Sequence, residues 1–279
     1  MIKSEIELYL QKIENEAIHG KNILAKINNV YGEKNAFENE KQLFEFFDKY
    51  IIFREGILKL INEVEKNIER IVCILNNYKN FVNSNNIFSA QSKYESTILE
   101  EFIYYLLKNM VNDDKLKYGS VNAYCNLYFS PKNLTTFLEN PSIRINTKDQ
   151  DFSIYRHLII KSEEKEYTID IPIIAIECKT YLDKTMLEGS IATAEKVKMG
   201  NPHTKFFIVT ETYEVDFSVD IAFSRIDQIF VLRKQKRRGT TINDIYSDVI
   251  LKLYCEVKRH LTADWVDIEK NINGNGLVK

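Results

Sequence analysis

Cysteine and histidine are scarce in this sequence, with four residues of each in a chain of 279. The cysteines at positions 73, 125, 178 and 255 form no Cys-x-x-Cys pair, which argues against a zinc ribbon and a disulfide framework. The histidines are scattered as widely, so the helical ligand spacing of zinc proteases is absent and a Ser-His-Asp triad has no support. We expect reduced thiols and structural histidines.

Long hydrophobic runs are also missing. No stretch approaches the roughly 20 apolar residues that cross a bilayer, and the N-terminal MIKSEIELYL carries two glutamates where a secretory signal is apolar. We therefore expect a cytoplasmic protein without a membrane partner. A hydrophobic content of 44% is enough for the core of one large domain or two smaller ones.

Positive charge is not in excess, since the net charge is −2. This balance does not exclude a nucleic-acid binder, because only the docking face has to neutralise phosphates. The segment RKQKRR follows the strand-like QIFVL and is the best candidate for such a face. By itself, a charge run of this kind is more often a solvated surface. Its candidate DNA-binding residues are Arg233, Lys234, Lys236, Arg237 and Arg238.

The first 82 residues contain no proline and carry apolar residues at helical spacing. They predict two or three long helices, with a break at 31–40 and a polar, Asn-rich linker at 76–86. We accordingly expect a helical region over 1–85 and a catalytic domain over 86–279. Periodicity leaves open whether the helical region serves packing, dimerisation or DNA reading.

The second region predicts an α/β fold, with elements in the order helix, strand, strand, strand, helix, strand. Its first element is a strongly amphipathic helix over about 90–111. A helix beginning near Thr185 is expected to end at Gly200 and Pro202, with Thr185 and Glu188 as a capping box. Strands are predicted over 121–129, 151–160, 167–180 and 205–211.

The strand IPIIAIECKTY, at 171–181, ends on charged residues. Burying an ionised group costs several kcal/mol unless it is paired or bound to a metal, so this strand end is either a salt bridge or a site. If 151–160 and 167–180 pair as a hairpin, opposed residue numbers sum to about 328. Asp151 then faces Glu177, Asp149 faces Lys179, and all four project from one face.

Directly opposed carboxylates lie close enough to share a cation, and without one they repel each other. Oxygen ligands of this kind favour Mg²⁺. Pro172 lies inside the second strand and predicts a bulge, which would offset the pairing by one residue. Asp170 is seven residues before Glu177 and should point to the opposite face.

With an acid-x-lysine at the end of an apolar strand and an aspartate on its hairpin partner, residues 90 to 215 resemble the PD-(D/E)XK nuclease superfamily. The resemblance implies a restriction-endonuclease-like core, a mixed sheet flanked by helices. It assigns the family aspartate to Asp151 and its Glu-x-Lys to Glu177 and Lys179. The chain departs from the pattern because Gln150 stands where proline usually precedes the aspartate, and Asp149 is a second candidate.

Many members of this superfamily also take an acid from the helix before the sheet. The candidates here are Glu95, Glu100 and Glu101. Ser96 places a small residue one turn before Glu100, which resembles the arrangement in related enzymes, so we select Glu100. The alternative is that all three are ordinary surface glutamates of the helix.

The stretch ECKTYLDKTMLEGS, at 177–190, resembles the DdeI and BbvCI group of restriction endonucleases, which cut sites of the CTNAG type. Asp183 and Thr185 lie in it, and we expect both to cap the following helix. The resemblance implies a Mg²⁺-dependent type II restriction endonuclease for duplex DNA. Asp151 and Glu177 would bind the metal, and Lys179 would orient the attacking water.

Cleavage of both strands needs two such sites, which implies a homodimer or a heterodimer with a related subunit. Two other interpretations stay open. One is a repair or defence nuclease that selects DNA structure over sequence. The other is a non-catalytic DNA-binding protein on a nuclease-like scaffold, whose charged triad is only a surface ion-pair cluster.

Overall fold

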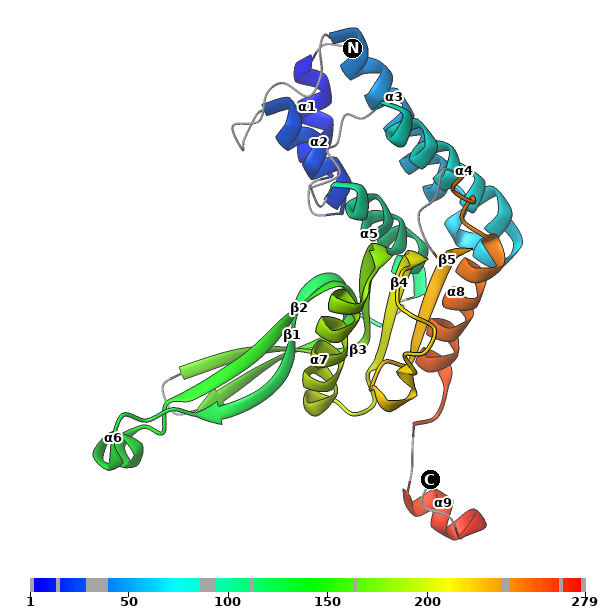
Figure 1. Ribbon diagram of the computed structural model, residues 1–279. Helices are drawn as coiled ribbons and strands as arrows, with labels where there is room; N and C mark the ends of the chain where they lie inside the picture. The colour runs from blue at the N-terminus through cyan, green and yellow to red at the C-terminus, as the bar shows by residue number, and fades with distance from the viewer. Residues whose placement is uncertain are drawn as a thin grey trace.

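A computed structural model describes residues 3–13, 16–28, 40–85, 94–110, 113–162, 165–236, 241–265 and 268–276. At its centre is a five-stranded sheet in the order β1-β2-β3-β4-β5 (Figure 1). The first three strands pair antiparallel and the last three parallel, so the sheet is mixed, as the resemblance to the nuclease superfamily implies. The strands are β1 (Leu116–Phe129), β2 (Ile143–Ser162), β3 (Lys165–Leu182), β4 (Lys205–Tyr213) and β5 (Gln228–Gln235).

Helices pack on both faces of this sheet, and most of the helical residues precede it in the chain. Those before the sheet are α1 (Lys3–Lys12), α2 (Ile18–Asn28), α3 (Glu40–Leu58), α4 (Val64–Asn85) and α5 (Tyr94–Leu107). Those between and after the strands are α6 (Leu134–Glu139), α7 (Lys184–Gly200), α8 (Ser247–Thr262) and α9 (Ile268–Asn275). None of the helices in the described ranges is both long and apolar enough to cross a bilayer.

Alternation along the buried strands divides the core between the two faces of the sheet. Ala175 on β3 and Ile208 on β4 pack on the α7 side with Leu187 and Ala194. Their neighbours Ile176 and Val209 point to the other face, into the larger core formed with α5, α8 and the N-terminal helices. The two parallel strands are therefore buried on both sides, which explains their nearly continuous apolar sequences.

The N-terminal region contains more helix than predicted. In the described part of the chain, four helices precede α5, where two or three were predicted. Helix α4 continues to Asn85, so the linker expected at 76–86 is wrong over 76–85, and residue 86 lies outside the described ranges. Asn76 shows why: its buried amide donates to the carbonyl oxygen of Ile245 and accepts from the Ile245 N–H. Tertiary hydrogen bonds thus stabilise a polar segment as helix. The expected break at 31–40 falls outside the described residues except for Glu40, where α3 begins.

The end of α4 coincides with the domain boundary expected near residue 85. One continuous hydrophobic core nevertheless runs from Ile6 in α1 through α5 to Val257 in α8. The helical region therefore packs directly on the sheet region, and the division into two domains stays a prediction.

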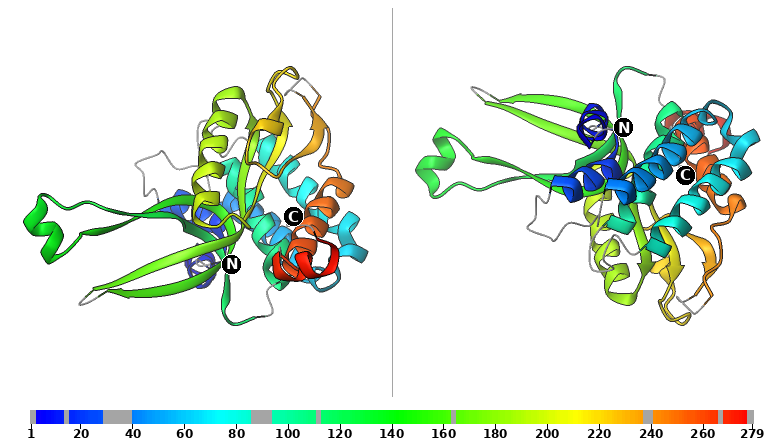
Figure 2. Two further views of the ribbon diagram at one scale, coloured as in Figure 1. Left: turned by 90° about the horizontal axis from the view of Figure 1, so that it is seen from below. Right: turned by 90° about the horizontal axis from the view of Figure 1, so that it is seen from above.

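A long β-arm is the feature that the sequence did not predict. β1 begins at Leu116 and β2 at Ile143, which is 5 and 8 residues before the predicted strands begin. The β1–β2 pair extends beyond the body of the molecule with α6 at its tip (Figures 1 and 2). The tip of the β2–β3 hairpin forms a second, separate projection (Figure 2).

Helix α7 begins with one of the two expected caps. The Asp183 side chain accepts a hydrogen bond from the Met186 N–H at 2.8 Å and is the N-cap, whereas Thr185 lies inside the first turn. At the other end, Gly200 packs against β1 so closely that an added Cβ would lie 2.7 Å from the Cys125 carbonyl oxygen. Gly200 thus fixes where α7 lies on the sheet.

We expect Gly200→Ala to lower the free energy of unfolding by about 1–3 kcal/mol, because β1 backbone atoms block the new methyl group. Urea unfolding followed by circular dichroism measures this loss. Gly189→Ala in the same helix is the matched control, since nothing lies within 4 Å of its added Cβ. It should be neutral or stabilising by up to about 1 kcal/mol. Equal stability of the two variants would contradict the packing described.

Candidate active site

The pairing of β2 with β3 follows the predicted register next to the site. Phe152 pairs with Ile176 and Ile154 with Ile174, both of which sum to 328. A one-residue shift then occurs beside Pro172, which pairs with Tyr155. The bulge expected from Pro172 is therefore present, and it lies on the side of the ladder away from Asp151.

Asp151 and Glu177 follow immediately beyond the last pair of this ladder. The Asp151 carboxylate reaches β3, where its Oδ2 accepts a hydrogen bond from the Cys178 N–H at 2.8 Å. Glu177 is almost completely buried, and its Oε2 accepts a 2.6 Å hydrogen bond from the Ser190 hydroxyl of α7. Lys179 places its Nζ 3.3 Å from the same oxygen. The structure thus brings together the three residues that the sequence selected.

Burial and the nearby carboxylates determine the pKa values of Lys179 and Cys178 at this site. Burial on its own would lower the pKa of Lys179, but the negative charges of Glu177 and Asp151 outweigh it and raise that pKa above its ordinary value. Burial raises the pKa of the Cys178 thiol well above its usual range, and Asp151 and Glu100 raise it further. Lys179 is therefore a stable cation, and Cys178 is a protonated core residue.

Glu100 of α5 contributes negative charge that raises the pKa of the Cys178 thiol, between the two candidate residues of β3. Its Oε1 accepts a hydrogen bond of 3.1 Å from Ser96, the small residue one turn earlier. Asp149 is exposed on β2, where it pairs with Asn122 of β1. Asp170 instead binds His157 across the β2–β3 hairpin, with 2.7 Å between Oδ1 and Nδ1.

The donor set suits a hard cation such as Mg²⁺. Asp151 and Glu177 offer carboxylate oxygens on the neighbouring strands β2 and β3, and their negative charges raise the pKa of Lys179. Across the described ranges, no three His, Cys, Asp or Glu side chains are clustered as a complete metal site. Mg²⁺ usually takes only one or two carboxylates and completes its shell with water and phosphate oxygens, so this set is sufficient.

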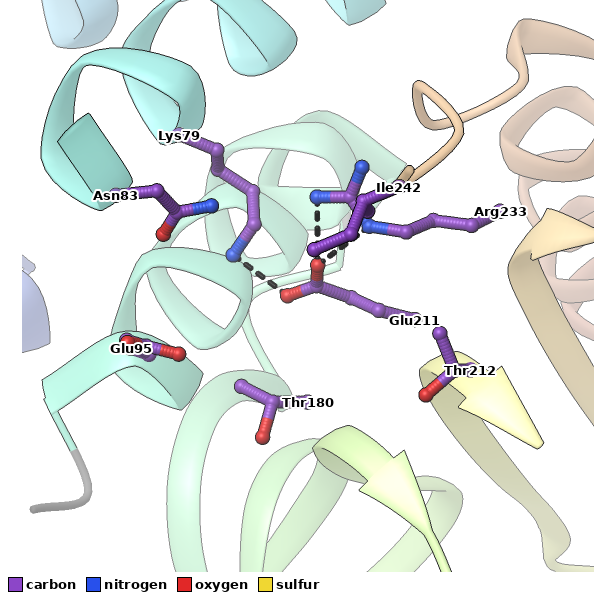
Figure 3. Close-up of a pocket in the computed structure, with 8 residues that line it drawn as sticks. All are labelled: Lys79, Asn83, Glu95, Thr180, Glu211, Thr212, Arg233 and Ile242. Atoms are coloured by element: carbon purple, nitrogen blue, oxygen red, sulfur yellow. Dashed lines mark hydrogen bonds and ion pairs between the residues drawn. The ribbon is translucent and has the colours of Figure 1, made fainter. Parts of the chain in front are cut away.

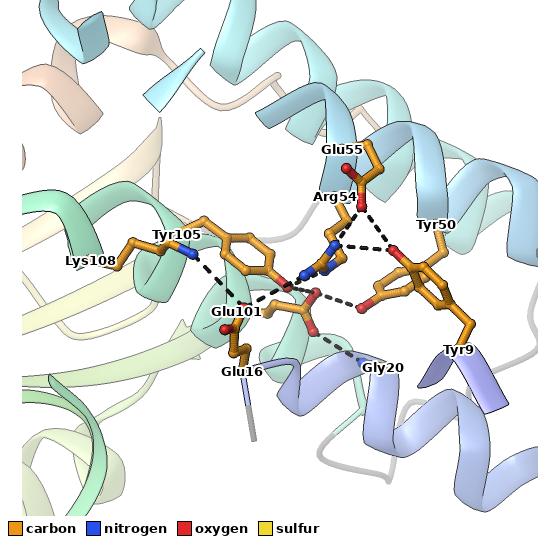
Figure 4. A network of polar contacts seen from close by, with 9 residues as sticks. All are labelled: Tyr9, Glu16, Gly20, Tyr50, Arg54, Glu55, Glu101, Tyr105 and Lys108. Atoms are coloured by element: carbon orange, nitrogen blue, oxygen red, sulfur yellow. Dashed lines mark hydrogen bonds and ion pairs between the residues drawn. The ribbon is translucent and has the colours of Figure 1, made fainter. Parts of the chain in front are cut away.

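Glu101 is buried in the protein interior and points away from the candidate site. Its carboxylate is fully buried among α2, α3 and α5 (Figure 4), where it accepts hydrogen bonds from the backbone N–H groups of His19 and Gly20. The hydroxyls of Tyr50 and Tyr105 donate to its other oxygen at 2.8 and 2.9 Å. The consecutive Glu100 and Glu101 therefore link the candidate site to the N-terminal helices through one turn of α5.

The basic segment 233–238 begins inside β5 and is less exposed than expected. Arg233 is only 2% exposed, and its guanidinium binds Glu211 of β4 and the carbonyl oxygen of Asn243. Lys234 forms an ion pair with Asp248 at 2.7 Å, and Lys236 lies over the ring of Phe217. Arg237 and Arg238 lie outside the described residues.

Arg233 therefore differs from an exposed phosphate contact: it neutralises a buried acid. Lys79 of α4 lies 2.6 Å from the other Glu211 oxygen (Figure 3). Burial on its own would raise the pKa of Glu211, but these two cations hold it below its ordinary value. The three side chains tie α4, β4 and β5 together.

The same side chains line a polar pocket of about 210 Å³ between α4, α5 and the ends of β3 and β4 (Figure 3). Glu95 of α5 and Thr180, the residue after Lys179, complete two of its walls. Glu95 therefore lines this pocket. The three candidate acids of α5, Glu95, Glu100 and Glu101, thus lie in three different environments.

The sequence of the chain identifies its family. The model of the Bpu10I restriction endonuclease family matches residues 91–272, which is more than half of the chain. The chain belongs to the Bpu10I restriction endonuclease family. The match spans α5, the complete sheet and α7, and therefore includes every residue of the candidate site.

A solved structure supports the fold of this family member over nearly its whole length. The chain is similar to one described as "native BbvCI A2B2 tetramer at low resolution", with a TM-score of 0.64 and 18% sequence identity. The similarity covers 88% of this chain and 98% of that one, so it includes N-terminal helices outside the family match. A search of curated protein sequences finds no match.

Sequence reasoning missed two parts of the site of this Bpu10I family protein. Ser190 could have been found as a polar residue on the apolar α7 stripe that contains Leu187, Ala194 and Val197. Glu211 closes an apolar strand in the same way as Glu177, but its partner Lys79 is 132 residues earlier and gives no local signal.

We expect the buried Glu101 to produce a specific pH dependence of stability. Burial raises its pKa above the ordinary 4.5, although four hydrogen bonds oppose the shift. The stability of the parent relative to Glu101→Gln should therefore be greatest below pH 4.5 and should fall as the pH rises through the folded-state pKa.

Denaturant unfolding of both proteins between about pH 4 and pH 8 tests this expectation. Glu101→Leu should be much less stable at every pH, because it leaves four buried donors without an acceptor. Glu188→Gln, at an exposed position of α7, is the control and should follow the parent. If the difference in unfolding free energy between the parent and Glu101→Gln does not change with pH, the raised pKa of Glu101 is contradicted.

Replacement of Arg233 should mainly lower the stability of the fold, and any effect on DNA affinity should be secondary. Arg233→Leu leaves the buried Glu211 with Lys79 alone, and we expect a loss of about 3 kcal/mol in the free energy of unfolding. Lys236→Gln removes a more exposed cation of the same segment and should change stability by less than about 0.5 kcal/mol. Thermal and urea unfolding measure both. Parent-like stability of Arg233→Leu together with a loss of DNA affinity would restore the direct-contact interpretation.

Proposed function

We propose that this protein is a Mg²⁺-dependent type II restriction endonuclease that hydrolyses phosphodiester bonds of duplex DNA at a short specific site. The observation that carries the proposal is the convergence of Asp151, in the middle of β2, with Glu177 and Lys179, in the last third of β3. Membership of a restriction endonuclease family supports the same activity. The PD-(D/E)XK assignment rests on these three residues.

Asp151 and Glu177 would hold the metal, with Glu100 near enough to support it from α5. The bound ion supplies an activated water and neutralises charge on the phosphate. Ser190 donates to Glu177 Oε2 and so fixes the carboxylate orientation before any ligand arrives. This preorganisation leaves the site little rearrangement on binding DNA.

Lys179 is the cation that acts on the reacting atoms. Its ammonium group is a compact point charge, and the raised pKa keeps it protonated across the neutral range. Placed beside Glu177, it can orient the attacking water or stabilise negative charge that develops on the phosphate.

Double-strand cleavage would require a second site from another subunit. The BbvCI structure is described as an A2B2 tetramer, and it supports an oligomer here, with either an identical or a related partner. Phosphate contacts would come from the cations that follow Arg233 in the basic segment: Lys234, which is exposed, Lys236, which is partly exposed, and Arg237 and Arg238. A site of the CTNAG type follows from the resemblance of residues 177–190 to the DdeI and BbvCI group.

The direct test is to incubate the purified chain with a long sequenced duplex, with Mg²⁺ or with EDTA, and to sequence the ends of the products. A restriction endonuclease yields Mg²⁺-dependent fragments whose ends share one short sequence. Nicks in a single strand of that sequence would indicate that a different partner subunit cuts the other strand. Smears or junction-specific cuts would instead support the structure-selective nuclease.

We expect Lys179→Met and Glu177→Gln each to reduce the cleavage rate by about 100-fold or more while DNA binding and folding are retained. Asp151→Asn should have a similar effect, whereas Asp149→Asn is its matched control and should cut at nearly the parental rate. Single-turnover cleavage and a filter-binding assay separate the two steps. Undiminished cleavage by both Lys179→Met and Glu177→Gln would falsify the proposed site, and metal-independent binding without any cleavage by the parent would support the non-catalytic interpretation.

A further inference from the structure

Helix α6 presents an apolar surface at the tip of the β1–β2 arm. Leu134, Phe137 and Leu138 are 71%, 47% and 75% exposed. Their spacing of three and four residues places all three on one side of the helix. Tyr128 and Phe129, at the end of β1, are also exposed beside this tip. An exposed patch of this kind on a protein surface usually marks an interaction site.

The body of the same molecule cannot cover this surface. The arm holds α6 at the far end of the molecule from the N-terminal helices and from α8 (Figures 1 and 2). Helix α6 contains no lysine or arginine and has one acid, Glu139, so it lacks the positive charge that a phosphate contact requires. The chemistry of the tip therefore indicates a protein partner.

A surface of suitable character lies between α3 and α4. A hollow of about 520 Å³ is bounded by Gly56 of α3, by Leu60 in the turn that follows α3, and by Cys73 and Ile74 of α4. Gly56 lets the two helices approach closely, since an added Cβ would lie 3.1 Å from the Ile74 side chain. The exposed Ile52, one turn before Gly56, extends the apolar stripe. Such a groove between helices accepts an apolar helix face with anchors at three- and four-residue spacing.

The charges around the two surfaces are complementary. Lys59 and Arg70 line the groove, and neither forms an ion pair within the described residues. Glu139 ends α6 and is likewise without an ion-pair partner in that part of the chain. At the opposite end of α6, Lys132 carries the sign that suits Glu69 on the groove rim.

We propose that the arm tip of one copy of this chain docks in the α3–α4 groove of a second copy. Leu134, Phe137 and Leu138 are the anchors, and Glu139 lies beside Lys59 and Arg70. Around a two-fold axis the contact occurs twice, once for each arm, so the assembly closes as a pair. This inference deepens the proposed function, because it assigns the contact that joins the two nuclease sites.

The groove contains a natural probe, because Cys73 is an exposed free thiol. We would place single cysteines at 134, 137 and 138 in a Cys255→Ser background and oxidise the proteins without DNA or metal. The proposal expects at least one of them to form a disulfide-linked dimer, and Cys73→Ser should abolish that dimer. Phe217→Cys is the control for random collision, since Phe217 is 74% exposed on another part of the molecule.

A second measurement does not depend on disulfide geometry. Sedimentation analysis of Phe137→Ser and Leu138→Ser should show dimerisation at least about tenfold weaker than in the parent, and both positions are exposed enough to leave folding intact. Glu139→Arg should also weaken the dimer, and Lys59→Glu with Arg70→Glu on the same chain should restore it.

Two results would overturn the assignment. The first is that the α6 cysteines crosslink no faster than Phe217→Cys and that the serine variants have the same association constant as the parent. A chain that stays monomeric gives this result too. The other is protection of the α6 cysteines from alkylation by duplex DNA alone, which would make DNA the occupant of the tip. Both readouts report assembly without cleavage, so their failure is distinguishable from failure of the nuclease proposal.

Discussion

The pairing of β2 with β3 at Phe152 and Ile176 is the constraint on which the candidate site depends. Because side chains alternate along a strand, this register sets which acids share a face and which are separated by the sheet. A shift of one residue at this point would move Asp151 away from Glu177. Pro172 does introduce such a shift, but the bulge lies beyond Ile174, so the pairing next to the site is preserved.

Two buried glutamates attach the helical region to this sheet. Glu101 collects hydrogen bonds from α2 and α3, and Glu211 binds cations from α4 and β5. Neither acid takes part in the proposed chemistry. Both fix elements that carry it, since Glu101 is adjacent to Glu100 on α5 and Glu211 lies on the strand that pairs with β3. The region before residue 85 is therefore part of the architecture of the site.

The arm and the groove give a physical reason for the uneven distribution of apolar surface. The acids and lysine of the candidate site belong to the body, whereas the most exposed apolar helix is carried at the end of a long hairpin. A second copy of the chain could cover that helix and would at the same time bring a second set of Asp151, Glu177 and Lys179. Assembly and double-strand cleavage would then depend on the same contact.

The sequence by itself determined the α/β class, the hairpin register next to the site and the meeting of Asp151, Glu177 and Lys179, because each follows from alternation and turns over short separations. Only the tertiary structure decided that 76–85 is helical, that Arg233 is buried and that Glu101 points away from the site. Those outcomes depend on partners 169, 22 and about 80 residues away, and local patterns carry no information about such contacts.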